Sequence, residues 1–219
     1  MTSFESAVLW THIAAGVVAL AAGGLALATA KGGRTHRRAG RAYVASMGVV
    51  VATVLPLFAV EQSFLRTFLL LVAVFSGYFA FSGYRALARK RPDDDPRLAD
   101  CAAAVAVAAA CVTLGAWGGT LVLAGDTFGV VMVVFGATGA ALGVADLRAF
   151  GRNADRPWLV NHLSRMVGGY VATVTAVSVV NLQAAPAVVA WLWPTAVGVP
   201  LIWYWQAEYG DRGPLAGRV

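Results

Sequence analysis

Charged residues are scarce in this chain. They make up 13% of its 219 residues, whereas soluble domains contain about a quarter. Hydrophobic residues account for 59%, and the mean hydropathy is +0.70. A soluble fold needs more polar side chains to cover its surface, while a lipid environment accepts an apolar exterior. The composition therefore excludes a soluble domain and predicts an integral membrane protein.

Cysteine and histidine are also rare. Cys101 and Cys111 lie in one apolar run, where a helix would hold them about 15 Å apart, beyond disulfide reach. The three histidines are too few for the seven-helix zinc hydrolases, and the last apolar run has no lysine to bind retinal. Glycine-rich phosphate loops, Ser/His/Asp sets and Cys-x-x-Cys pairs are absent from the sequence as well. These absences exclude the familiar enzyme classes, and we predict no metal site.

Long apolar runs are abundant instead. A helix needs roughly 20 apolar residues to cross the hydrocarbon core, and seven runs approach or exceed that length. They cover residues 6–30, 43–60, 67–88, 98–124, 127–150, 157–180 and 187–205. The second is the shortest. We predict an all-α fold in which residues 1–219 form a single seven-helix transmembrane bundle.

Segments rich in basic residues alternate along the chain with segments that have few charges. Cytoplasmic loops carry an excess of Lys and Arg. Basic residues cluster after the first, third and fifth runs: Lys31, Arg34, Arg37, Arg38 and Arg41; Arg85, Arg89, Lys90, Arg91 and Arg97; Arg148, Arg152 and Arg156. The opposite ends have only Glu5, Glu61, Arg66 and Asp126. The pattern predicts an outside N-terminus and a cytoplasmic C-terminus, and it accounts for the net charge of +6 without a nucleic-acid partner.

Polar residues inside the apolar runs are costly in lipid and therefore indicate function. The sixth run contains Asn161, His162 and Arg165. His162 and Arg165 are three residues apart and share one helix face. We expect Arg165 to pair with Asp146 at the end of the fifth run, because a short connection makes these helices antiparallel neighbours. A purely structural ion pair remains the alternative.

The first basic segment adds His36, Arg37 and Arg41. Topology explains the arginines but not the histidine, and His36 could approach His162 at the same leaflet. With Arg165 the two histidines would form a basic pocket suited to an anionic headgroup, a phosphate or a carboxylate. His12, alone on the first run, is a second candidate. Gly136, Gly139 and Gly143 are spaced for close helix packing.

Several of these segments resemble a known family. The strings are His12-Ile13-Ala14-Ala15-Gly16, Lys31-Gly32, His36-Arg37, Gly40-Arg41, Tyr43, Met47, Asn161-His162-Leu163-Ser164-Arg165-Met166 and the stretch from Tyr170 to Thr175. They are similar to those of the domain-of-unknown-function 2306 family of bacterial membrane proteins, over most of the chain. The resemblance implies a multi-pass protein of the bacterial plasma (inner) membrane and carries over no activity.

Three functions fit these observations. The first is binding or transport of a small anionic or lipid-like ligand at the cytoplasmic-side cluster. The second is a structural or assembly subunit of a membrane complex. The third is a haem-binding redox protein, with His162 and Met47 as ligands, since His12 and His162 are expected in opposite leaflets. We favour the first, with the lipid bilayer as partner and without an enzymatic activity.

Overall fold

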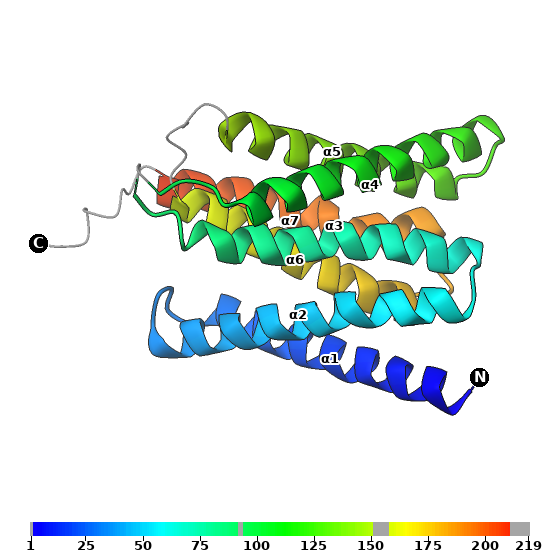
Figure 1. Cartoon of the computed structure of the whole chain (residues 1–219), viewed down its shortest axis with the longest axis horizontal. Helices are drawn as coiled ribbons and strands as arrows, with labels where there is room; N and C mark the ends of the chain where they lie inside the picture. The colour runs from blue at the N-terminus through cyan, green and yellow to red at the C-terminus, as the bar shows by residue number, and fades with distance from the viewer. Residues whose placement is uncertain (1, 92–93, 151–157, 211–219) are drawn as a thin grey trace, which may run out of the picture. The chain divides into compact units, whose positions relative to one another are not determined.

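Helices make up almost all of the structure, a computed structural model that describes residues 2–91, 94–150 and 158–210 (Figure 1). Across these ranges the helices are α1 (Ser3–Ala28), α2 (Arg34–Val60), α3 (Phe64–Ala86), α4 (Leu98–Leu123), α5 (Phe128–Phe150), α6 (Trp158–Asn181) and α7 (Ala187–Gly210). No strand occurs among the described residues. All seven helices are long and apolar enough to cross a membrane. The predicted all-α, seven-span, multi-pass architecture is confirmed.

Two helices extend more than three residues beyond the apolar runs. α2 begins at Arg34 rather than at residue 43, and α7 ends at Gly210 rather than at residue 205. Most of the first basic cluster therefore lies on the opening turns of α2 and not in a loop, and α2 has 27 residues instead of being the shortest helix. Hydropathy identifies the part of a helix that can lie in hydrocarbon. The Arg and Ala residues at the start of α2 continue the helix beyond that part, because both residue types have high helix propensity.

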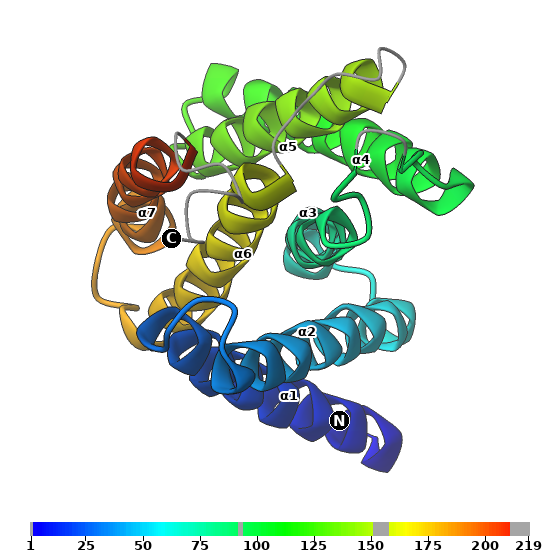
Figure 2. The same ribbon diagram turned by 90° about the vertical axis from the view of Figure 1, so that its left-hand side faces the viewer.

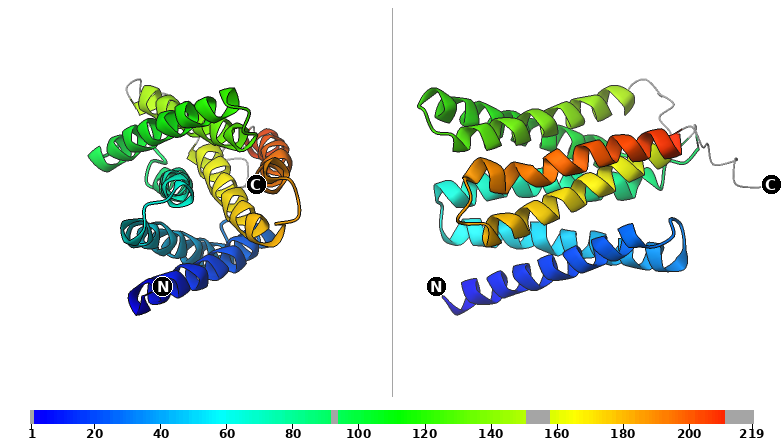
Figure 3. Two further views of the ribbon diagram at one scale, coloured as in Figure 1. Left: turned by 90° about the vertical axis from the view of Figure 1, so that its right-hand side faces the viewer. Right: turned by 180° about the vertical axis from the view of Figure 1, so that it is seen from behind.

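The chain divides into two compact units, Met1–Gly77 and Tyr78–Val219, with the boundary inside α3. In the first unit α1 and α2 pack side by side (Figure 1). In the second unit α4 packs along α5 (Figure 2), and α6 packs along α7 (Figure 3). Each of these pairs consists of consecutive helices, so short connections make the partners antiparallel neighbours.

Glycines allow α4 and α5 to approach closely. A Cβ atom added to Gly136 would lie 2.4 Å from the backbone nitrogen of Gly115, and one added to Gly143 would lie 2.7 Å from the carbonyl oxygen of Ala104. Gly139 is also buried. The packing predicted for this face of α5 is confirmed. On the side of α5 that faces α7, the ring of Trp191 makes edge contacts with Phe128 and Phe135, at centroid distances of 6.1 and 6.0 Å.

Candidate functional site

A buried polar cluster joins α3, α5 and α6 in the second unit. Arg165 donates a hydrogen bond of 2.7 Å from Nη2 to Oδ1 of Asp146. The hydroxyl of Tyr78 donates to Oδ2 of the same carboxylate, and the Arg165 guanidinium lies 5.6 Å from the centre of the Tyr78 ring. The ion pair expected between Asp146 and Arg165 is therefore present, and Tyr78 completes it from α3.

The two side chains of this ion pair are largely buried, which makes the pair costly to break. Arg165 is 6% exposed, and the Asp146 side chain is 14% exposed. Separating two buried charges costs several kcal/mol because neither can recover its hydration. The pair is also incomplete, since Nη1 of Arg165 is buried and has no hydrogen-bond partner among the described residues. A buried donor left in this state costs about 1–3 kcal/mol, so the cluster lacks one acceptor.

His162 lies one turn before Arg165 and anchors α6 to α3. Its Nδ1 is 2.8 Å from the carbonyl oxygen of Gly83. A carbonyl only accepts, so Nδ1 carries a proton, and in the neutral ring Nε2 is the acceptor nitrogen. A Cβ atom on Gly83 would lie 3.0 Å from the Cβ of Arg165, so only a very small residue fits there. Half-buried Asn161 opens the same turn.

α7 reaches the edge of this cluster through a side-chain contact. Gln206 donates a hydrogen bond of 2.6 Å from Nε2 to the hydroxyl of Ser164, which in turn donates to the carbonyl oxygen of Val160. The first turns of α6 are thereby fixed from two sides.

A second charged cluster lies at the start of α4. Arg85 binds Asp100 through two hydrogen bonds, from Nε to Oδ1 at 2.9 Å and from Nη2 to Oδ2 at 2.8 Å. Nη1 of Arg89 is 3.5 Å from the same Oδ1. Asp100 is 2% exposed. Sequence reasoning missed this cluster, because it assigned the arginines to topology and did not consider Asp100, which stands near the start of the 98–124 run.

Tyr78 was also missed, although a signal existed. The string Phe-Ser-Gly-Tyr occurs twice, ending at Tyr78 and at Tyr84. A spacing of six residues places the two copies on different helix faces. Tyr78 is 5% exposed and binds Asp146, whereas Tyr84 is 46% exposed. Only the first copy belongs to the cluster.

The candidates from the first basic segment lie together in the first unit. Nδ1 of His36 is 3.0 Å from the carbonyl oxygen of Ala26, at the end of α1. Arg37 donates from Nη1 to the carbonyl oxygen of Gly32 at 2.6 Å, and Arg41 donates from Nε to that of Arg37 at 3.3 Å. The first two contacts hold the α1–α2 turn, and the third lies within α2. The approach of His36 to His162 stays a prediction.

His12 joins α1 to α2. Its Nδ1 is 2.8 Å from Oγ1 of Thr53. That hydroxyl lies 2.8 Å from the carbonyl oxygens of both Val49 and Val50. Because the hydroxyl proton is directed to the backbone, Thr53 accepts from His12. The arrangement favours a structural role for His12.

An unexpected ion-pair network lies at the other end of the first unit. Nη2 of Arg66 is 2.6 Å from Oε1 of Glu5 and 2.9 Å from Oε2 of Glu61. Its Nη1 donates to the carbonyl oxygen of Leu57 at 2.5 Å. The sequence placed these charges at the predicted outer ends, but it gave no reason to pair residues 61 positions apart.

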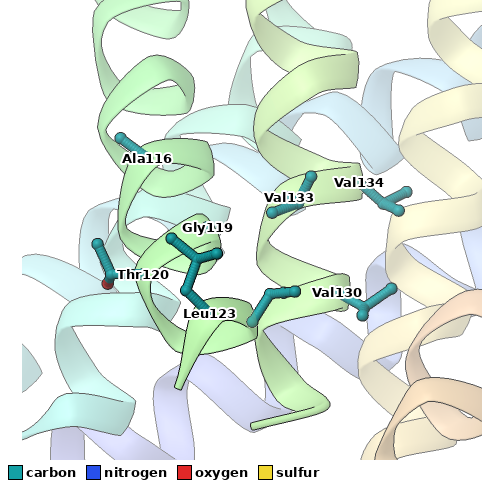
Figure 4. Close-up of a pocket in the computed structure, with 8 residues that line it drawn as sticks. Ala116, Gly119, Thr120, Leu123, Val130, Val133 and Val134 are labelled. Atoms are coloured by element: carbon teal, nitrogen blue, oxygen red, sulfur yellow. The ribbon is translucent and has the colours of Figure 1, made fainter. Parts of the chain in front are cut away.

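The α4–α5 pair also bears an apolar pocket of about 560 Å³ near its connecting turn (Figure 4). Ala116, Gly119 and Thr120 line it from α4, and Val130, Val133 and Val134 line it from α5. Asp100 and Asp146 stand at the opposite ends of the same two helices. The pocket therefore takes no part in either charged cluster.

Across residues 2–91, 94–150 and 158–210, no group of three or more His, Cys, Asp and Glu side chains could hold a metal ion. No protein-family model, curated protein or solved structure matches this chain. What the protein does must therefore be inferred from the geometry of its own residues.

Proposed function

We propose that this protein binds or transports a small anionic or lipid-like ligand at the cluster of Tyr78, Asp146, His162 and Arg165. One observation carries the proposal: Nη1 of Arg165 is a buried, charged donor without an acceptor among the described residues. Arginine binds carboxylates and phosphates through paired N–H donors. An oxyanion at Nη1 would supply the missing acceptor.

The charge balance of the cluster explains how a ligand would be released. Arg165 and Asp146 together are neutral, so an incoming anion competes with Asp146 for one guanidinium. Tyr78 keeps a hydrogen bond on Asp146 during that exchange. The protein carboxylate thus limits the affinity for the anion, which suits a carrier better than a storage protein.

The remaining predicted ligand residues extend the same proposal. Asn161 adds an amide at the start of α6. His36, Arg37 and Arg41 belong to the proposed ligand-binding set as basic residues that would attract an anion. This part of the proposal rests on the sequence pattern, because the two sets belong to different units.

The membrane orientation and the family are also proposed from the sequence pattern. The excess of Lys and Arg after α1, α3 and α5 supports an outside N-terminus and a cytoplasmic C-terminus in a bacterial plasma membrane. The His12 and His162 strings support membership of the domain-of-unknown-function 2306 family.

Inorganic phosphate and acetate are suitable probes for the site. The purified full-length protein should gain thermal stability as either probe is added, since a ligand that binds only the folded state stabilises it. Arg165→Gln should abolish that gain. Asp146→Asn should increase the apparent affinity about tenfold, because Arg165 then has no competing carboxylate. Arg148→Gln, which removes an exposed arginine from the same helix end, is the control.

The two functional alternatives predict different outcomes. If neither probe stabilises the wild-type protein and Asp146→Asn gains nothing, the ion pair serves only to lock helices together, as in a structural or assembly subunit. A Soret absorption band that disappears in His162→Ala would instead support haem.

A further inference from the structure

Arg89 carries a positive charge that Asp100 does not fully compensate. Oδ1 of Asp100 already accepts from Nε of Arg85, and Oδ2 accepts from Nη2 of Arg85 and from the backbone N–H of Arg97. Nη1 of Arg89 is left at 3.5 Å from Oδ1 and makes no hydrogen bond among the described residues. Among the described residues, two guanidinium groups thus share one carboxylate, which leaves one positive charge in excess.

Aromatic side chains hold this charge and a neighbouring one at the ends of two helices. The Arg89 guanidinium lies 4.8 Å from the centre of the Phe150 ring, at the last residue of α5. Nζ of Lys90 lies 4.8 Å from the centre of the Trp158 ring, at the first residue of α6. Cation–π contacts of this kind restrict the cations without neutralising them.

The position of these residues along the chain suits contact with lipid headgroups. Arg89 and Lys90 lie three and four residues after Ala86, the last residue of α3, which is long and apolar enough to span a membrane. Tryptophan rings such as that of Trp158 prefer the interfacial region. Lys90 is exposed, whereas the Arg89 side chain is 18% exposed and its Nη1 atom is buried, so a ligand that approaches from outside meets Lys90 first.

We propose that Arg89 and Lys90 form a binding site for a phosphate group. A phosphate brings the missing negative charge and several acceptor oxygens, and it can bind Arg89 while Arg85 stays with Asp100. The same chemistry is offered by the phosphodiester of an anionic lipid and by inorganic phosphate. Among the described residues no hydrogen bond or ion pair joins Arg89 to the Arg165 cluster, although the charge of Arg89 acts on Tyr78. The proposal does not depend on the function proposed for that cluster.

The lipid arm uses the full-length protein in phosphatidylcholine nanodiscs that contain a minor fraction of phosphatidylglycerol. Native mass spectrometry counts the phosphatidylglycerol molecules that stay bound. Arg89→Gln should lower this retention about tenfold, as expected for loss of a charged hydrogen bond. Arg91→Gln removes the same charge from a nearby exposed position and should change retention less than twofold.

The second arm uses inorganic phosphate with discs of phosphatidylcholine alone. A thermal stabilisation by phosphate that Arg89→Gln abolishes would assign the site to free phosphate, whereas retention of phosphatidylglycerol without that effect would assign it to lipid. Lys90→Gln should show a smaller loss in whichever arm responds, and it tests the site if Arg89→Gln does not fold.

Equal retention by the Arg89 and Arg91 variants, with no response to phosphate, would overturn the site. Arg165→Gln should leave phosphatidylglycerol retention unchanged. A loss there together with Arg89→Gln would mean that one anion site, and not two, exists in this unit.

Discussion

Arg165 shows how a single side chain can be both tightly held and incompletely satisfied. One nitrogen binds Asp146 and another is buried without a hydrogen-bond partner among the described residues. In a low-dielectric interior the first contact resists separation, while the second leaves an interaction for an incoming group. Stability and ligand recognition can therefore be tested at the same residue.

The ion pair itself predicts a non-additive effect on stability. Arg165→Gln or Asp146→Asn alone should destabilise the protein by about 3–5 kcal/mol, because each leaves a buried charge without its partner. The double variant should be more stable than either single variant. A double-mutant cycle of unfolding free energies in detergent measures the coupling. Additive losses would show that the two side chains do not stabilise one another.

At the scale of helices, apolar length predicted the elements better than it predicted their ends. Most helix limits lie within three residues of the apolar runs, but α2 starts nine residues early. Its first turns carry Arg34, Arg37, Arg38 and Arg41, which hydropathy assigns to a loop although arginine favours helix. Helix propensity and membrane burial are different properties, and only the second is read from hydropathy.

Proline substitution tests the start of α2. Arg34 is the first helical residue after the N-cap Gly33, where proline is tolerated because the backbone N–H is not needed. Arg38→Pro should cost about 3 kcal/mol, since its backbone N–H lies inside the helix. Arg34→Pro should cost much less. Thermal unfolding of the two variants compares their losses of stability. Equal and small losses would show that this segment is a loop and not part of α2.

The α4–α5 contact gives a second prediction for helices. Gly136→Ala should destabilise by about 1–3 kcal/mol, because the new Cβ would meet the backbone of Gly115 and force the helices apart. Gly119→Ala should be neutral or slightly stabilising, since nothing lies within 4 Å of its added Cβ. Resistance to unfolding by sodium dodecyl sulfate ranks the two. A milder effect at Gly136 than at Gly119 would contradict the close packing.

The candidate site was predictable where its partners are close in sequence. Asp146 and Arg165 lie at the facing ends of consecutive helices, so their pairing followed from antiparallel packing. Tyr78, Arg85 and Arg89 reach the clusters from α3, and no sequence rule fixes which face of α3 meets α5 or α4. That choice depends on packing between helices that are not consecutive, such as the fit of Gly83 against Arg165.

For the whole molecule, the charge pattern predicts the orientation in the membrane. If all seven candidate spans cross the membrane, the two ends of the chain lie on opposite sides. A tag at the N-terminus should be labelled by an impermeant reagent on intact cells, and a tag at the C-terminus should be labelled only after permeabilisation. Labelling both tags from the same side would remove the seven-span interpretation.

The consecutive pairing of helices has a consequence for biosynthesis. α1 with α2, α4 with α5 and α6 with α7 are each adjacent along the chain, so each pair can form as soon as its second helix leaves the ribosome. α3 is the exception within this order. Arg85 of α3 can bind Asp100 only after the start of α4 has been synthesised. Tyr78 of α3 can bind Asp146 only after α5 has been synthesised. Arg165 is the last of these residues to be synthesised. Asp146 can therefore form its ion pair only after α6 has been inserted, so the synthesis of α6 is the step that completes the cluster.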